Sequence, residues 1–160
     1  MEFKEFKEKV ESWARVRGIY DESTEAHQQA KALEEIGEYL TAETDEERMD
    51  AIGDIAVCIV NAAKIKGEWV AIYDYTAGGC IGDVADLILS SRYKYSLSQL
   101  KAFTFGHGYK FEDCLEQAWN EIKGRKGMMI DGKYVKWENL TDEQREEFER
   151  RDPANTLIRQ

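Results

Sequence analysis

The sequence predicts an all-α protein: a bundle of helices with one small extended or hairpin element near residues 127–137. Apolar residues recur at three- and four-residue steps through much of the chain, which is the period of a helix with one buried face. Proline, which breaks helices, occurs only at Pro153. Asp131-Gly132 lies between two short apolar runs and indicates the turn of the hairpin. The 160 residues are enough for one core, so we expect a single domain over residues 1–160.

Glycines and polar turns separate the expected helices. These cover residues 2–17, 25–42, 45–66, 80–91, 96–105 and 111–124. The polar turn YDEST precedes the second helix and offers Ser23 or Thr24 as its N-cap. Gly78-Gly79 breaks the chain before the fourth helix. From about residue 141, the sequence TDEQ matches a capping box and opens a charged C-terminal helix.

Composition excludes some classes of function. The formal net charge is −10 and the pI about 4.8, so the chain lacks the basic footprint of a protein that coats a nucleic acid polymer. Free nucleotides remain open as partners, because a divalent cation held by carboxylates can reverse the local sign. The three cysteines form no C-x-x-C pair and fit a reducing compartment. No apolar stretch reaches the length of a membrane span, so we expect a cytoplasmic protein without a membrane partner.

Three carboxylates, Glu34, Glu35 and Glu38, fall in the helix expected over 25–42. On a helical wheel Glu34 and Glu38 lie opposite an apolar side, and Glu35 lies on its flank. That apolar side consists of Leu33, Ile36, Tyr39 and Leu40. Because Glu35 and Glu38 are spaced i and i+3, they can converge on one ion.

In the next expected helix, Asp50, Asp54, Asn61 and Lys64 share one narrow stripe. Such a stripe is either a solvated face or the wall of a site. Asp50 and Asp54 are like charges one turn apart, which costs about a few tenths of a kcal/mol. Carboxylates gathered without basic partners are the oxygen ligands that Mg²⁺ or Mn²⁺ requires. We therefore treat them as candidate metal ligands.

These residues form a longer pattern, in which Gln28 and Lys31 precede E-E-x-x-E at residues 34–38 and D-A-I-G-D follows at residues 50–54. The pattern resembles the MazG-like all-α nucleoside triphosphate pyrophosphohydrolases, whose E-E-x-x-E is followed by E-x-x-D. The segment CLEQAWNEIKGRKGMMIDGKYVK, residues 114–136, is similar to the tail of the short phage and bacterial members. One position departs from the family, because Ala51 stands where glutamate is usual. Asp50, one residue earlier, is the candidate substitute, and the number of bound metal ions stays open.

The resemblance implies a helical bundle of that family and Mg²⁺-dependent hydrolysis of a ribo- or deoxynucleoside triphosphate to the monophosphate and pyrophosphate, with Mn²⁺ able to substitute. Glu34 is the implied general base. The implied metal ligands are Glu35, Glu38, Asp50 and Asp54. The implied substrate-binding residues are Lys31, Asn61, Lys64, Lys123, Arg125 and Lys126. The last three fit equally well a helix C-terminus whose basic residues complement its dipole.

Two alternatives stay open. One is a dUTPase- or dCTPase-like house-cleaning enzyme of the same superfamily, with the same metal chemistry and a narrower base pocket. The other is a non-enzymatic, acidic phage-type protein that mimics DNA or binds a host factor, which the charge of −10 favours. Some phage members of the family act on dGTP and GTP, so we expect purine substrates to be preferred. The family also implies a homodimer or homotetramer.

Overall fold

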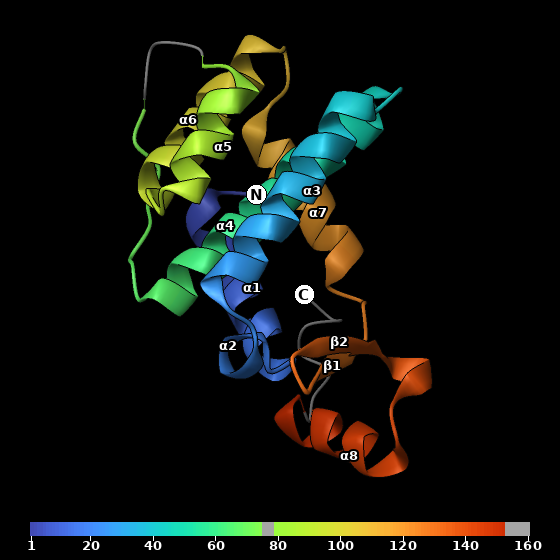
Figure 1. Ribbon diagram of the computed structural model, residues 1–160. Helices are drawn as coiled ribbons and strands as arrows, with labels where there is room; N and C mark the ends of the chain where they lie inside the picture. Colours follow the sequence, from blue (N-terminus) through green and yellow to red (C-terminus); the bar gives the residue numbers. More distant parts are fainter. Residues whose placement is uncertain (75–78, 153–160) are drawn as a thin grey trace.

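The structure, a computed structural model, describes residues 1–74 and 79–152 and confirms an all-α fold with a small hairpin (Figure 1). Its helices are α1 (Phe3–Val16), α2 (Ile19–Glu22), α3 (Glu25–Thr41), α4 (Asp45–Lys66), α5 (Ile81–Leu89), α6 (Tyr93–Gly106), α7 (Phe111–Ile122) and α8 (Asp142–Arg151), with a 3-10 turn η1 (Trp137–Asn139). The strands are β1 (Gly127–Ile130) and β2 (Lys133–Lys136). The expected break at Gly78 and the single Pro153 lie outside the described residues.

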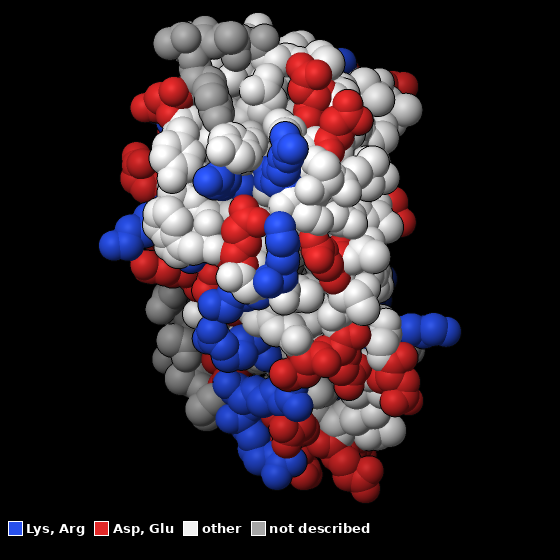
Figure 2. All heavy atoms as spheres, turned by 60° about the vertical axis from the view of Figure 1, so that its left-hand side comes forward, with Lys and Arg blue, Asp and Glu red and all other residues white. Residues whose placement is uncertain are grey.

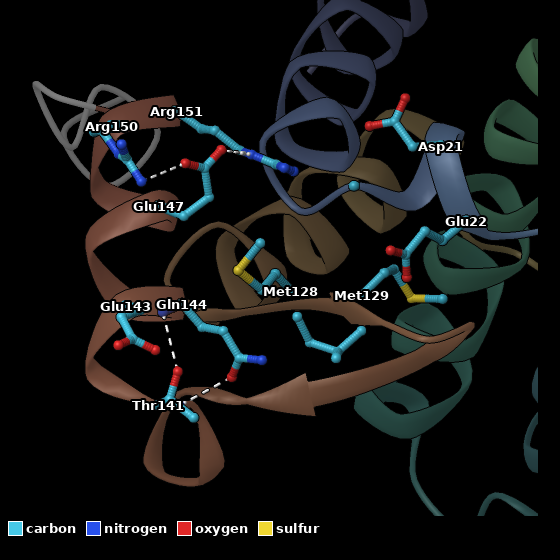
Figure 3. A pocket seen from close by; sticks show the side chains of 12 residues that line it. Asp21, Glu22, Met128, Met129, Thr141, Glu143, Gln144, Glu147, Arg150 and Arg151 are labelled. Carbon is cyan, nitrogen blue, oxygen red and sulfur yellow. Dashed lines mark hydrogen bonds and ion pairs between the residues drawn. The ribbon is translucent and has the colours of Figure 1, made fainter.

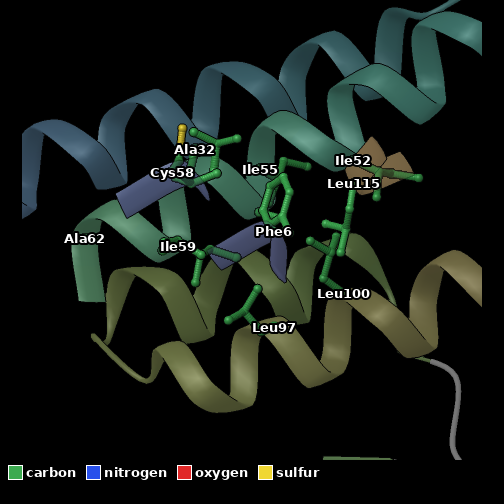
Figure 4. Packing of buried hydrophobic residues seen from close by; sticks show 14 of the residues in the cluster. Phe6, Ala32, Ile52, Ile55, Cys58, Ile59, Ala62, Leu97, Leu100 and Leu115 are labelled. Atoms are coloured by element: carbon green, nitrogen blue, oxygen red, sulfur yellow. The ribbon is translucent and has the colours of Figure 1, made fainter. Parts of the chain in front are cut away.

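Helix α4 is the centre of the bundle. It lies side by side with α3 and also contacts α1, α6 and α7 (Figure 1). Between Ala51 and Ala63 every residue except Asp54 is buried, so neighbouring helices cover this helix on nearly all sides. The core joins aliphatic side chains from α4 and α6 to Phe6 of α1 and Leu115 of α7 (Figure 4). In the described part of the chain, no helix is long and apolar enough to cross a membrane.

The helix starts follow the expected capping chemistry. Thr24 is the N-cap of α3, and its hydroxyl accepts a hydrogen bond from the backbone N–H of His27. Thr44 and Glu47 form a capping box at the start of α4, and Thr141 with Gln144 forms the expected one at α8. These caps satisfy backbone N–H groups that have no partner within their own helix.

Three details differ from the sequence prediction. Part of the expected polar turn YDEST is the short helix α2, which begins directly after Gly18. Helix α6 begins at Tyr93, three residues earlier than expected. Leu40, placed on the apolar side of α3, is 65% exposed. The reason is that the face of α3 packed against α4 carries Ala32, Ile36 and Tyr39, so the buried face is narrower than the wheel indicated.

The hairpin and α8 form the lower end of the molecule in Figure 1. Strands β1 and β2 are antiparallel and joined by Asp131 and Gly132, whose φ angles of 50° and 75° fit a type I′ turn, which needs positive φ at both central residues. The ring of Trp137 meets that of Phe148 of α8 edge-on, with centroids 5.6 Å apart. This small second cluster holds α8 against the hairpin.

Arg17 ties the hairpin to α1. Its side chain is 1% exposed and donates hydrogen bonds to the carbonyl oxygens of Trp13 and Arg125. Its guanidinium also lies 4.4 Å from the ring centre of Trp13 and 5.4 Å from that of Phe148. Burial lowers the pKa of Arg17 to about 10, so the group stays charged at neutral pH. The backbone at Arg125 is thereby fixed beside α1.

Gly53 allows the close contact between α4 and α7. A Cβ atom there would meet the carbonyl oxygen of Cys114 and, at 2.5 Å, the Cβ of Ala118. We expect Gly53→Ala to lower the free energy of unfolding by about 1–3 kcal/mol, because this overpacking outweighs the better helix propensity of alanine.

Gly37 on α3 is the matched control, since nothing lies within 4 Å of its Cβ position. Gly37→Ala should raise stability by about 0.5–1 kcal/mol. Urea denaturation measures both, and equal effects of the two substitutions would contradict the close approach of α4 and α7.

Candidate functional site

A cavity of about 430 Å³ lies where α1, α2, α3, α4 and the hairpin meet. Its apolar lining is formed by Trp13, Ile19, Val57, Ile122 and Met129. Five of the candidate residues line it as well, namely Lys31, Glu35, Asp54, Asn61 and Arg125. The lining also includes five polar residues that were not predicted as site residues: Ser23, His27, Gln28, Lys133 and Tyr134. Only Gln28 had a signal, as the first residue of the pattern that carries the family resemblance.

Two of the four candidate metal ligands, Glu35 and Asp54, line this cavity, whereas Glu38 and Asp50 do not. Both have a raised pKa, and the charge of Glu35 helps to raise the pKa of Asp54. Burial is the main cause in both cases and, with the charges of Glu38 and Asp50, raises the pKa of Glu35 and of Asp54 to about 7. The charges of Glu35, Glu38 and Asp50, from both helices, therefore all bear on Asp54.

Asp50 is the most unusual of the four. Its Oδ1 atom is buried and has no hydrogen-bond partner among the described residues. Burial raises the pKa of Asp50, and the positive charge of Arg125 only partly opposes this. A buried carboxylate oxygen without a partner costs free energy unless something else satisfies it.

The residues fit a hard divalent cation in their chemistry. Within residues 1–74 and 79–152, no three His, Cys, Asp or Glu side chains are already arranged to hold a metal ion. The donor set nonetheless consists of carboxylate oxygens, which Mg²⁺ and Mn²⁺ prefer, and it includes the unpartnered oxygen of Asp50. A cation at this place would offset the repulsion that raises the pKa values of Glu35 and Asp54.

The structure separates the predicted basic residues of the site into those that line the cavity and those that do not. Lys31 and Arg125 line the cavity, together with Lys133 of the hairpin. Lys64 does not line the cavity and instead pairs with Glu11 of α1 at 3.2 Å.

The other two predicted basic residues also have partners outside the cavity. Lys123 donates a hydrogen bond to Asn120, and the ammonium of Lys126 lies 5.0 Å from the ring centre of Trp137. Arg125, which does line the cavity, is also paired with Glu121. Of the predicted basic trio, Arg125 is thus the member that the fold places at the site.

Glu34 and Glu38 are exposed on α3 and do not line the cavity. Glu38 still acts on Glu35 through its charge and a side-chain hydrogen bond. Glu34 points about 100° away from Glu35 around the helix. Its role as general base stays a prediction. It can meet a ligand only where that ligand leaves the cavity at the edge of α3.

A larger cavity, of about 550 Å³, lies between the hairpin and α8 (Figure 3). Three of its charged side chains already pair with one another. Glu147 pairs with Arg150 at 2.7 Å and with Arg151 at 2.9 Å, and Thr141 and Gln144 cap α8. It holds none of the predicted site residues, so we assign the candidate site to the smaller cavity.

We compared the chain with models of protein families, with curated proteins and with solved structures, and none of these comparisons gives a match. The geometry of the site and the sequence pattern therefore carry the proposed function.

The raised pKa values predict how stability depends on pH in the absence of metal. The folded-state pKa of about 7 for Glu35 and Asp54 exceeds the value of about 4 in an unfolded chain. The folded state therefore binds protons more tightly than the unfolded state. The stability that the protonated carboxyls contribute is fully present below pH 4 and is lost as the pH rises through 7.

We expect Asp54→Asn to raise the melting temperature by about 3–5 °C at pH 8 in EDTA, and by about half as much at pH 5.5. Thermal unfolding of both proteins across this range measures the difference. A difference that does not change with pH would contradict the shifted carboxylates.

Proposed function

We propose that the protein is a Mg²⁺-dependent nucleoside triphosphate pyrophosphohydrolase of the MazG-like type. The observation that carries the proposal is the carboxylate group of α3 and α4. Glu35 and Asp54, with raised pKa values, line a cavity that also holds basic side chains, and Asp50 has a buried oxygen without a partner among the described residues. Structural ion pairs do not explain this arrangement, because the repulsion among the carboxylates is only partly opposed by Arg125 and Lys31.

In this proposal Glu35, Glu38, Asp50 and Asp54 hold the cation. When bound, Mg²⁺ supplies charge neutralisation for the triphosphate and a more acidic water. Lys31, Arg125 and Lys133 bind phosphate oxygens at the mouth of the cavity. Glu34 takes a proton from the water while the water oxygen forms a bond to the α-phosphorus. The bond from that phosphorus to the bridging oxygen then breaks, and pyrophosphate leaves.

The apolar side of the cavity is the proposed place of the nucleobase. Trp13, Val57 and Met129 provide flat and flexible apolar surface, and Asn61 provides a buried amide. We further propose that the protein works in the cytoplasm as a homodimer or homotetramer, as the family resemblance implies. dGTP and GTP remain the proposed preferred substrates, by the same analogy.

The distribution of charge speaks against the acidic mimic of DNA. Figure 2 shows one face of the molecule, on which basic and acidic side chains are interspersed from end to end. A mimic would instead present a continuous acidic surface. On this face, at least, the charge of −10 is not concentrated into such a surface.

Substitution of the proposed metal ligands tests the function. We expect Glu38→Ala and Asp54→Ala each to lower the rate of pyrophosphate release from a panel of NTPs and dNTPs by more than about 100-fold. Even the loss of a residue that supports a metal ligand costs about 10- to 100-fold. The control is Glu46→Ala, an exposed carboxylate in the first turn of α4, which should keep the wild-type rate. Wild-type turnover in either ligand variant would rule out the metal assignment.

Asp50 is the proposed substitute for the glutamate that the family usually has at the position of Ala51. Substitution of Asp50 tests this assignment most sharply. We expect Asp50→Asn to lose about 10-fold or more in rate, because it removes the charge of a carboxylate with a buried, unpartnered oxygen. The Mg²⁺ concentration for half-maximal rate should rise, and Mn²⁺ should restore part of the rate because it accepts neutral ligands more readily. If rate and Mg²⁺ dependence stay at wild-type values, the site works without Asp50.

A further inference from the structure

The buried amide of Asn61 is held from behind by Tyr20 of α2. The Tyr20 hydroxyl donates a hydrogen bond of 2.8 Å to Oδ1 of Asn61. Asn61 is 2% exposed and lines the cavity, whereas Tyr20 does not line it. Burial raises the pKa of Tyr20, so its hydroxyl keeps the proton that it donates. Tyr20 therefore contacts the amide from the protein side and leaves the other side to the cavity.

This contact decides what Asn61 can offer to a ligand. An asparagine amide has one acceptor and two N–H donors, and either end can face a given direction unless a neighbour selects one. With Oδ1 bound to Tyr20, the group left for the cavity is the Nδ2 donor, and no other hydrogen bond engages this side chain within the described residues. A ligand atom that meets Asn61 must then be an acceptor.

The position of Asn61 along α4 indicates which ligand atom that is. Asn61 follows Asp54 by seven residues, so the two lie on nearly the same face about 10 Å apart. The carboxylates and cations mark the phosphate side of the proposed substrate. The base edge farthest from the sugar then points toward Asn61, and that edge carries the 6-substituent of a purine or the 4-substituent of a pyrimidine.

We propose that Tyr20 is a positioning residue that makes the site select nucleotides with an oxo group, and not an amino group, on that edge. This inference rests on the proposed function, because it takes the ligand to be a nucleotide. Guanine, uracil and thymine accept a hydrogen bond there. Adenine and cytosine would place an amino donor against the amide donor, leaving both unpaired in a buried place.

Binding of nucleoside monophosphates tests the inference without any turnover. Calorimetric titration with dIMP against dAMP, and with dUMP against dCMP, compares an oxo with an amino group on otherwise similar rings. The wild-type protein should bind the oxo member of each pair about 10-fold more tightly. Tyr20→Phe, which keeps the ring, should reduce that ratio to about 2-fold, because the amide can then turn its oxygen to the ligand.

Two further variants separate this role from a structural one. Asn61→Asp accepts from Tyr20 with one oxygen and presents the other to the ligand, so it should favour the amino member of each pair. Tyr109→Phe is the matched control, since it removes a hydroxyl that donates at 2.8 Å to Asp45 and does not line the cavity. It should keep the wild-type ratios.

The outcomes divide cleanly. The inference is overturned if Tyr20→Phe weakens the binding of all four ligands equally. It is also overturned if the wild-type protein binds both members of each pair alike, or binds none of the four. Wild-type selectivity that Tyr20→Phe reduces and Asn61→Asp reverses, without pyrophosphate release from triphosphates, would support the inference and contradict the proposed hydrolysis. Pyrophosphate release by the wild-type protein, together with unchanged binding ratios in Tyr20→Phe, would support the proposed hydrolysis and contradict the inference about Tyr20.

Discussion

Packing of α3 against α4 is the interaction on which the rest of the structure depends. It buries the apolar face of α3 against the central helix and, along the same seam, brings Glu35 close enough to Asp54 for its charge to raise the pKa of Asp54. Gly53, between Asp50 and Asp54, lets α7 approach the opposite side of α4. The seam thus combines favourable apolar burial with unfavourable carboxylate repulsion. Such repulsion in a fold that could have avoided it is typical of a functional site.

The cavity beside this seam has a charged side and an apolar side, and one helix spans both. Asp54 and Asn61 project from the same stripe of α4, so the rigid helix sets the separation between them. The hairpin closes the cavity with Lys133 and Tyr134, and buried Arg17 fixes the backbone at Arg125. The groups proposed to bind phosphate and base are therefore held by several elements, among them α3, α4 and the hairpin, all anchored on the bundle.

Much of the fold and part of the candidate site were predictable from local sequence patterns. Caps at Thr24 and Thr141 and the turn at Asp131-Gly132 follow from chemistry within a few residues, and the structure confirms all three. The meeting of Glu35 with Asp54 was predictable too, since two helices joined by a short loop pack side by side. Helix α2 was missed, because four residues are too few to show a period. The hairpin residues at the cavity were also missed, because contacts between distant segments leave no local signal.

The central claim is that the carboxylates of α3 and α4 are held together for a divalent cation. Proton release on addition of Mg²⁺ to metal-free protein at pH 7, followed with a pH indicator in weak buffer, tests it most directly. Glu35 and Asp54 are each about half protonated at that pH, so binding should release about one proton per chain, and Asp54→Asn should release less. Addition of Mg²⁺ that releases no proton and leaves the melting temperature unchanged would contradict the account.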